Sequence, residues 1–121
     1  MQSNALSIAR PNAAQRFAAA ALESVHSPRY LRFLETAWDQ WVAIDPANAA
    51  HDALPSVWPT RGFRTDVEPE NFAARMGLYS FDAGSPLTSG TWVAARAGAE
   101  CALSAADQIA QGARAAFALS R

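Results

Sequence analysis

Few side chains in this sequence could carry acid–base, nucleophilic or metal chemistry. The two histidines, His26 and His51, are far apart, and neither has another histidine three or four positions away. The single cysteine, Cys101, can form no internal disulfide and could supply only one ligand of a thiolate zinc site. Metal or triad chemistry would therefore have to come from an unusually sparse set of residues, and we interpret Cys101 as a small packing residue.

Composition excludes several classes of function. The chain has 121 residues, enough for one modest core, and 29 of its many apolar residues are alanine. Charged residues make up 17% of the chain, the net charge is −1, and the arginines are scattered, which argues against a nucleic-acid partner. Because there is neither an apolar run of about 18 residues nor a signal peptide, we expect a cytoplasmic protein with no membrane partner.

The first half of the sequence predicts two helices. Residues 12–24 begin with the capping-box-like spacing of Asn12 and Gln15, but this helix is alanine-rich and would bury little area. A stronger helix begins after Ser27 as N-cap, with Pro28 in its first turn, and ends at Asp45-Pro46. We expect its apolar stripe to face the core; the residues of that stripe are Tyr30, Leu31, Leu34, Trp38, Trp41 and Val42.

Residues 45–66 form a long predicted loop that still carries large apolar side chains. Such loops are functional or interfacial in many proteins, but this one could equally pack over the domain's own core. A short helix is expected after Pro69, ending near Gly77, and residues 78–81 could be extended.

A fourth helix is expected from Thr88 or Ser89 to Gln111, with Gly112 as its left-handed C-cap. Its predicted inner face comprises Trp92, Ala95, Ala99, Ala102, Leu103, Ala106 and Ile109. Residues 115–119 then form a nearly uncharged apolar run, which is typical of a strand buried on both faces of a parallel sheet. We therefore expect a mostly helical chain with one or two short strands.

Three blocks of sequence resemble one family. Residues 25–38, VHSPRYLRFLETAW, resemble the V-H-x-x-Y-L-x-F-L-E-T-A-W stretch of bacterial acetylpolyamine amidohydrolases, which belong to the zinc-dependent histone deacetylase superfamily. Residues 77–92, GLYSFDAGSPLTSGTW, are similar to the family's G-Y-Y-x-x-D-x-x-T-P-I-x-x-G-T-W segment. Residues 115–121 resemble the strand that runs into P-P-G-H-H in those enzymes. The blocks are in family order and cover about residues 22–121.

The resemblance implies an α/β chain, the N-terminal part of a three-layer αβα arginase/deacetylase-type fold. Residues 1–121 would then be an incomplete portion of one deacetylase domain. In the complete enzyme, two aspartates and a histidine hold zinc, a tandem histidine pair handles protons, and a tyrosine stabilises the oxyanion. Those residues would follow Arg121, and His26 and His51 have no matching ligand positions. The resemblance therefore implies no catalytic residue and no metal ligand in this chain.

Two features are implied to serve the substrate of the complete enzyme. Asp82 resembles the aspartate at the active-site rim that accepts hydrogen bonds from the substrate, although it could equally serve the turn from Asp82 to Pro86. The 45–66 loop resembles an insertion that narrows the substrate channel and contributes to a homodimer contact.

We thus expect a fragment of a zinc-dependent deacetylase acting on acetyl-lysine or acetylpolyamine amides, and we expect this chain alone to be inactive. The alternative is a stand-alone helical module that binds a partner protein without catalysis. Cooperative unfolding of the isolated chain would favour the alternative, because an incomplete domain leaves apolar surface uncovered and should be molten.

Overall fold

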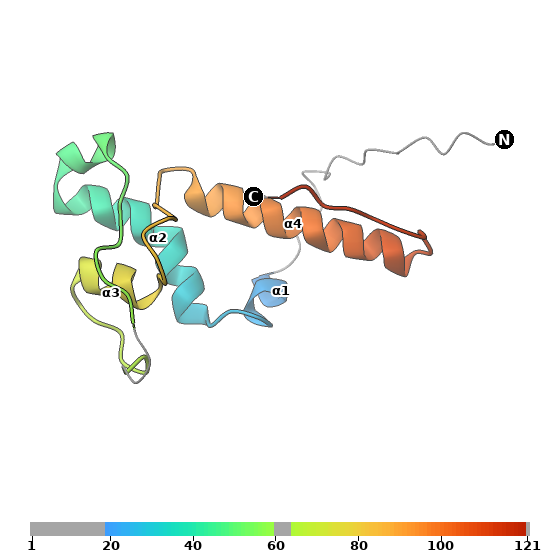
Figure 1. Ribbon diagram of the computed structural model, residues 1–121, viewed down its shortest axis with the longest axis horizontal. Coiled ribbons are helices and arrows are strands. Elements are labelled where there is room, and N and C mark those ends of the chain that lie inside the picture. The colour runs from blue at the N-terminus through green and yellow to red at the C-terminus, as the bar shows by residue number, and fades with distance from the viewer. Residues whose placement is uncertain (1–18, 60–63, 121) are drawn as a thin grey trace.

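A computed structural model describes residues 19–59 and 64–120. Within these ranges the chain forms helices and no strand (Figure 1). The helices are α1 (Ala19–Glu23), α2 (Pro28–Ile44), the short 3-10 helix η1 (Pro46–Ala50), α3 (Phe72–Leu78) and α4 (Thr91–Ala110). Of the predicted helix over 12–24, the end is observed as α1, and residues 12–18 lie outside the described part of the chain.

Helix α2 begins and ends where the sequence predicts. The Ser27 side chain accepts a hydrogen bond from the Tyr30 backbone N–H at 3.4 Å, and Pro28 occupies the first helical position. At the other end, the Asp45 carboxylate accepts from the Ala47 N–H at 2.9 Å and so caps η1. The same aspartate therefore ends one helix and starts the next.

The buried face of α2 is narrower than predicted and is rotated. Phe33 and Ala37, one turn apart, are 4% and 1% exposed, whereas Leu34 and Trp41 from the predicted stripe are only half-buried. The prediction omitted Phe33, because large apolar residues lie around more than half of this helix and sequence alone does not say which of them meet a neighbour.

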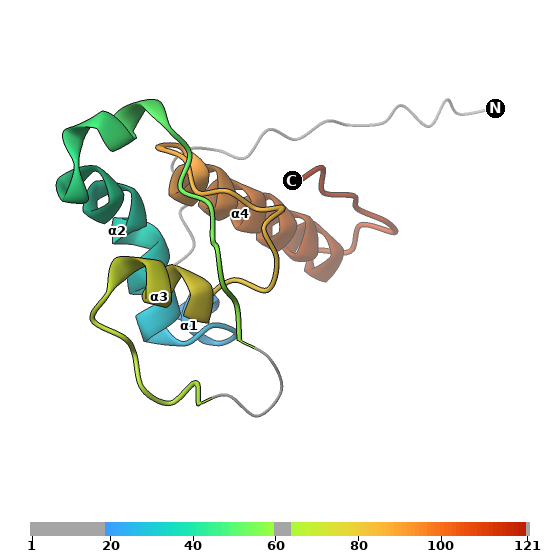
Figure 2. The ribbon, with the colours of Figure 1, turned by 60° about the vertical axis from the view of Figure 1, so that its left-hand side comes forward.

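The core lies between this face of α2 and three other segments. It consists of Phe33, Ala37, Ala53, Phe72, Met76 and Leu87. The Phe33 ring lies 6.2 Å from Phe72 and 4.8 Å from Tyr79, and the Trp41 ring stacks 5.9 Å from Phe72. In Figure 2 the green segment after η1 descends past α2 and α3. It is joined to the chain before α4 by an antiparallel bridge between Ala53 and Leu87.

Neither predicted strand is formed in the described part of the chain. Leu78 is the last residue of α3, and residues 79–81 continue as a turn. Residues 115–120 are without regular structure, and the Phe117 and Leu119 side chains are 87% and 88% exposed rather than buried. Both predictions were wrong for this chain, because a strand needs a neighbouring strand and no described segment lies in register to supply one.

Helix α4 begins later than predicted and ends as predicted. It starts at Thr91, whose Oγ1 accepts a hydrogen bond from the Thr88 N–H at 2.8 Å. It ends in a Schellman motif: Gly112 has a φ of +100°, its N–H donates to the Ile109 carbonyl at 3.0 Å, and the Ala113 N–H donates to the Gln108 carbonyl at 2.9 Å.

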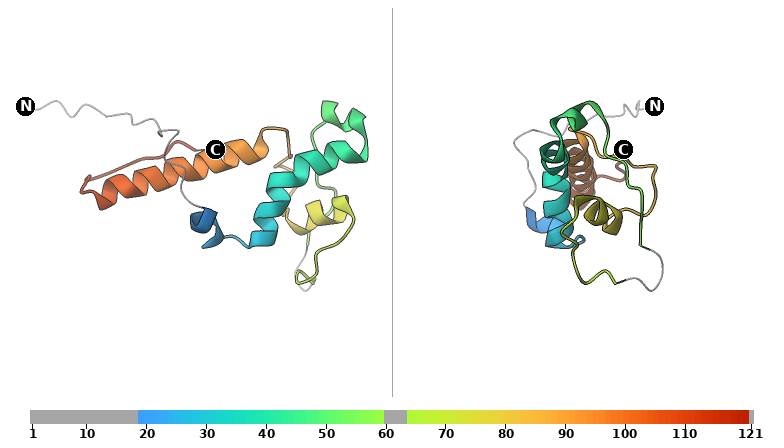
Figure 3. Two further views of the ribbon diagram at one scale, coloured as in Figure 1. Left: turned by 180° about the vertical axis from the view of Figure 1, so that it is seen from behind. Right: turned by 90° about the vertical axis from the view of Figure 1, so that its left-hand side faces the viewer.

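The described residues cover the predicted inner face of α4 only in part: Trp92, Ala99 and Leu103 are half-buried, and the other four residues are exposed. No α4 residue is buried, Ile109 is 47% exposed, and Cys101 is half-buried rather than part of a core. The helix projects away from α2 and α3 in Figure 1 and in the left-hand view of Figure 3. Its first turn lies beside α2, where Trp92 lines a small pocket with Leu34 and Trp38.

The loop and α3 touch so closely that one position requires glycine. A Cβ atom at Gly77 would lie 2.7 Å from both the Val57 carbonyl oxygen and the Val57 Cγ2 atom. We therefore expect Gly77→Ala to lower the free energy of unfolding by about 1–3 kcal/mol, since backbone would have to move.

Urea unfolding measures this change. Gly90→Ala is the matched control, because a Cβ atom there meets no atom within 4 Å. We expect it to change stability by less than about 0.5 kcal/mol. Equal effects of the two substitutions would contradict the close contact.

Candidate functional site

Asp82 lies in the turn that follows α3 and is half-buried. Its Oδ1 atom accepts a hydrogen bond from the Gly84 N–H at 2.8 Å, which is the turn role that the sequence left open. A carboxylate can accept several hydrogen bonds, so this bond does not occupy the group completely. The role of Asp82 at an active-site rim therefore stays a prediction.

The 45–66 loop both packs on the core and exposes apolar side chains. Ala53 and Pro55 are buried, while Leu54 and Val57 are 56% exposed and Trp58 is 45% exposed. The start of the loop is held by α2, because Trp41 Nε1 donates to the His51 carbonyl at 3.0 Å. Packing on the core is thus observed for part of the loop, and the interfacial role stays a prediction.

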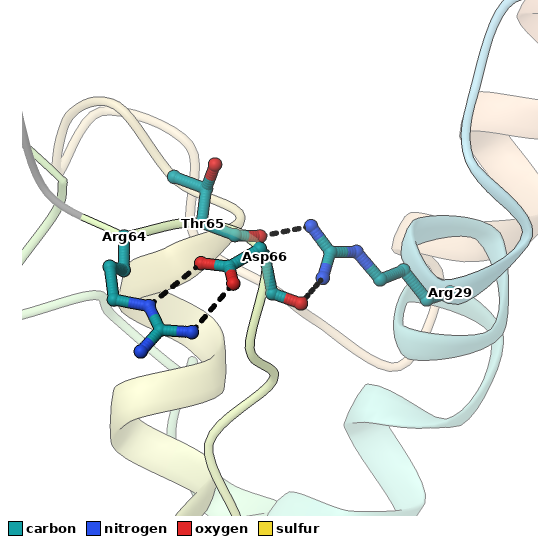
Figure 4. Close-up of polar contacts among 4 residues, drawn as sticks. All are labelled: Arg29, Arg64, Thr65 and Asp66. Carbon is teal, nitrogen blue, oxygen red and sulfur yellow. Dashed lines mark hydrogen bonds and ion pairs between the residues drawn. The ribbon is translucent and has the colours of Figure 1, made fainter.

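An arginine on α2 holds the far end of this loop (Figure 4). Arg29, in the first turn of the helix, donates one hydrogen bond to the Asp66 carbonyl at 3.1 Å and another to the Thr65 carbonyl. The guanidinium fork fits two adjacent carbonyl oxygens, which a lysine could not match. Arg29 therefore fixes the path of the backbone at the loop's end.

The ion pair beside this contact contributes less to stability than the Arg29 hydrogen bonds. Arg64 donates from Nε and Nη2 to the two carboxylate oxygens of Asp66, at 3.0 and 2.7 Å. The hydrogen bond from Arg64 lowers the pKa of the Asp66 carboxyl group and raises that of the guanidinium. Both side chains are mostly exposed, so we assign this pair little stabilisation.

A tyrosine and a second arginine attach the segment between the loop and α3. The Tyr79 hydroxyl donates to Glu68 Oε2 at 3.0 Å. Arg75 donates to the carbonyls of Pro69 and Glu70, at 3.3 and 2.7 Å, and to Oε1 of Gln40 on α2. Arg75 also lines a groove of about 630 Å³ between α2 and α3, but these bonds already engage its guanidinium group.

Sequence reasoning missed these attaching residues. Arg29, Arg75 and Tyr79 act on backbone carbonyls or on residues distant in sequence, and no spacing pattern marks such contacts. Only their place in the sequence pointed to two of them. Arg29 lies in residues 25–38 and Tyr79 in residues 77–92, which both resemble stretches of the family.

The described residues do not form a metal site. No group of three or more histidine, cysteine, aspartate or glutamate side chains in residues 19–59 and 64–120 could hold a metal ion. His26 is exposed with its ring 5.4 Å from that of Tyr30, and His51 and Asp52 are exposed at the end of η1. The described residues therefore do not fit the zinc ion of the family, and we derive no step through it. The same ranges contain no helix that is both long and apolar enough to cross a membrane.

Comparison with solved structures defines the class of fold. The chain superposes with a TM-score of 0.70 on the crystal structure of acetylpolyamine aminohydrolase from Burkholderia pseudomallei, at 31% sequence identity. The match covers 88% of this chain and 30% of that chain. The chain is thus a mostly helical part of an arginase/deacetylase fold, as the sequence predicted.

The sequence comparisons identify the family. The histone deacetylase domain matches residues 2–121, so the likeness extends beyond the part of the chain that the three blocks cover. The chain is 43% identical over 117 residues to acetylpolyamine amidohydrolase 2 of Pseudomonas aeruginosa and 38% identical over 97 residues to acetylpolyamine amidohydrolase of Mycoplana ramosa. These matches cover 97% and 80% of this chain but only 33% and 27% of the relatives. The chain belongs to the histone deacetylase family and spans about a third of the length of the curated relatives it matches.

The Arg29 contact can be tested by removing its donors and keeping its aliphatic stem. We expect Arg29→Met to lower the free energy of unfolding by about 1 kcal/mol and to speed trypsin cleavage after Arg64, because the backbone there loses its anchor. Arg32→Met, at an exposed position on the same helix, is the control and should change neither measurement. An unchanged cleavage rate in Arg29→Met would contradict the anchoring role.

Tyr79 predicts a dependence of stability on alkaline pH. Burial, and then the hydrogen bond to Glu68, raises the pKa of the Tyr79 hydroxyl above its ordinary value of 10.0. The folded state therefore holds this proton more tightly than the unfolded state, so its stabilising contribution is complete below about pH 10 and is lost as the pH rises further.

Urea unfolding at a series of pH values from about 9 to 11 measures this contribution. We expect the difference in free energy of unfolding between the wild type and Tyr79→Phe to shrink as the pH rises through this range. A constant difference would show that the two folding states hold the proton equally.

Proposed function

We propose that this chain forms part of an enzyme that hydrolyses the acetamide bond of acetylated amines, either acetylpolyamines or acetyl-lysine. The observation that carries this proposal is the 43% identity to acetylpolyamine amidohydrolase 2 of P. aeruginosa over 97% of this chain. The family's zinc would serve the complete enzyme as Lewis acid, with ligands outside the described residues. The chain alone is expected to be inactive.

Within that enzyme, the chain would shape the approach to the catalytic centre. Arg29 and the Ala53–Leu87 bridge attach the 45–66 loop to α2 and to the segment before α4. Asp82 lies in the turn between α3 and that bridge. This arrangement supports a role of the loop in narrowing the channel and of Asp82 in binding the substrate. The homodimer contact through this loop and the cytoplasmic location stay predictions; exposed Leu54, Val57 and Trp58 suit such a contact.

The alternative function, a helical module that binds a partner protein, rests on the same exposed apolar residues. It predicts that the isolated chain unfolds cooperatively and keeps a fixed tertiary structure. Thermal melting followed by near-UV circular dichroism separates the two proposals, since an incomplete domain should show no sharp transition.

A chimeric enzyme tests the amidohydrolase proposal. Residues 2–121 of this chain replace the matching segment of P. aeruginosa acetylpolyamine amidohydrolase 2, and hydrolysis of an acetylated polyamine and of an acetyl-lysine peptide is measured. We expect the chimera to hydrolyse at least one of them and the isolated chain to hydrolyse neither. A folded but inactive chimera, or an active isolated chain, would refute the proposal.

Two substitutions in the chimera separate the roles of Asp82. Asp82→Asn keeps an oxygen that can accept from the Gly84 N–H but loses the charge, whereas Asp82→Ala loses both. If Asp82 binds the substrate, we expect Asp82→Asn to lower kcat/KM about 10-fold or more with little change in stability. If Asp82 serves only the turn, Asp82→Asn should be as active as the unsubstituted chimera.

A further inference from the structure

The small pocket between α2 and the start of α4 is lined by two tryptophan side chains. Its volume is about 200 Å³, and Leu34 and Trp38 on α2 line it together with Trp92 on α4. Both tryptophans are half-buried, so part of each ring is open to solvent. Two buried core residues, Ala37 and Leu87, also line the pocket. The pocket therefore has an apolar, largely aromatic wall that reaches the core.

Two carboxylates line the exposed side of the same pocket. Glu35 and Asp39 are exposed and lie four positions apart on α2, so their Cβ atoms are about 5–6 Å apart. The ion pairs within residues 19–59 and 64–120 join other residues, so neither of these carboxylates is paired there. None of the described residues that line the pocket is basic. The pocket is therefore negatively charged on one side and apolar on the other.

This combination of side chains is complementary to an organic cation. The face of an indole ring attracts ammonium and guanidinium groups. Trp92 already makes such a contact, because the Arg96 guanidinium lies 5.9 Å from its ring centroid. Arg96 is itself paired with Glu100 at 3.7 Å and does not line the pocket. The apolar wall favours a cation with an aliphatic chain over a fully hydrated one, because only the aliphatic chain gains from leaving water.

We propose that this pocket binds a short aliphatic diammonium ion. Its two ammonium groups would pair with Glu35 and Asp39, and its methylene chain would lie against the rings of Trp38 and Trp92. A bound dication would also remove the repulsion between the two like charges on α2. The inference goes beyond the proposed function and does not rest on it, because the lining of the pocket alone gives the class of ligand.

Titration of the full 121-residue chain with diaminobutane, which carries an amino group at each end, tests the pocket. NMR spectra of the indole N–H groups give the Kd and the location of binding together. We expect the Trp38 and Trp92 signals to shift with a single Kd, and the signal of Trp58, outside the pocket, to stay unchanged. The titration is run at low salt, because salt screens exposed charges.

Two comparison cations separate charge from shape. Butylamine keeps the methylene chain but has one ammonium group, so it should bind at least about 2-fold more weakly than diaminobutane. Magnesium chloride supplies the same charge without a chain, so magnesium should bind at least about 5-fold more weakly.

Matched variants locate the binding groups. Glu35→Gln combined with Asp39→Asn should weaken diaminobutane binding at least about 5-fold, and its folding is not endangered because it removes a like-charge pair. Asp52→Asn combined with Asp107→Asn removes two charges at exposed positions outside the pocket and should change the Kd less than about 2-fold. Trp92→Leu keeps an apolar side chain but loses the ring, and should weaken binding at least about 3-fold.

The same titration is carried out on the chimeric enzyme, so that a molten isolated chain does not hide the pocket. Binding to either protein with the expected effects of the variants would support the inference. No shift of the Trp38 and Trp92 signals in either protein would overturn it. Equal affinity of the wild type and the double carboxylate variant, or equal affinity for magnesium and diaminobutane, would also overturn it. An inactive chimera that binds diaminobutane would refute the proposed function and leave the pocket standing.

Discussion

The contact between Phe33 on α2 and Phe72 and Tyr79 at the two ends of α3 is the constraint on which the rest of this chain depends. Ala37, one turn further along, is almost fully buried, and its small side chain lets other segments approach the helix closely. The same helix supplies the polar anchors of the loop: Arg29 near its start and Trp41 near its end. One helix thus contacts the backbone near both ends of the 45–66 segment.

Features that depend on local chemistry could be predicted from the sequence. The Ser27 cap, the stop at Asp45-Pro46 and the left-handed turn at Gly112 each satisfy backbone groups within a few residues, so their signals lie in a few adjacent positions. Asp82 was correctly placed in a turn for the same reason. By contrast, the buried face of α2 and the absence of strands from residues 19–59 and 64–120 depend on which segments meet. Composition and periodicity do not specify those contacts.

The 45–66 loop is buried at some positions and exposed at others because part of its backbone is extended. Ala53 and Pro55 point into the core while Leu54 and Ser56 are exposed, which is the alternation of an extended backbone. Ala53 and Leu87 exchange both of their backbone hydrogen bonds at 2.9 Å, but Pro55, at the next hydrogen-bonding position, has no N–H to donate. Pairing therefore stops at a single bridge, and the segment is anchored without becoming a strand.

The high alanine content helps α4 to stay helical although none of its residues is buried. Alanine has the highest intrinsic helix propensity, so a helix rich in it loses little when its side chains are uncovered. Helix α4 can therefore keep its shape while none of its residues is buried, and the Schellman motif at Gly112 holds the direction in which the chain leaves it. The small side chains that dilute the core near α2 thus suit α4, which stays ordered with little burial.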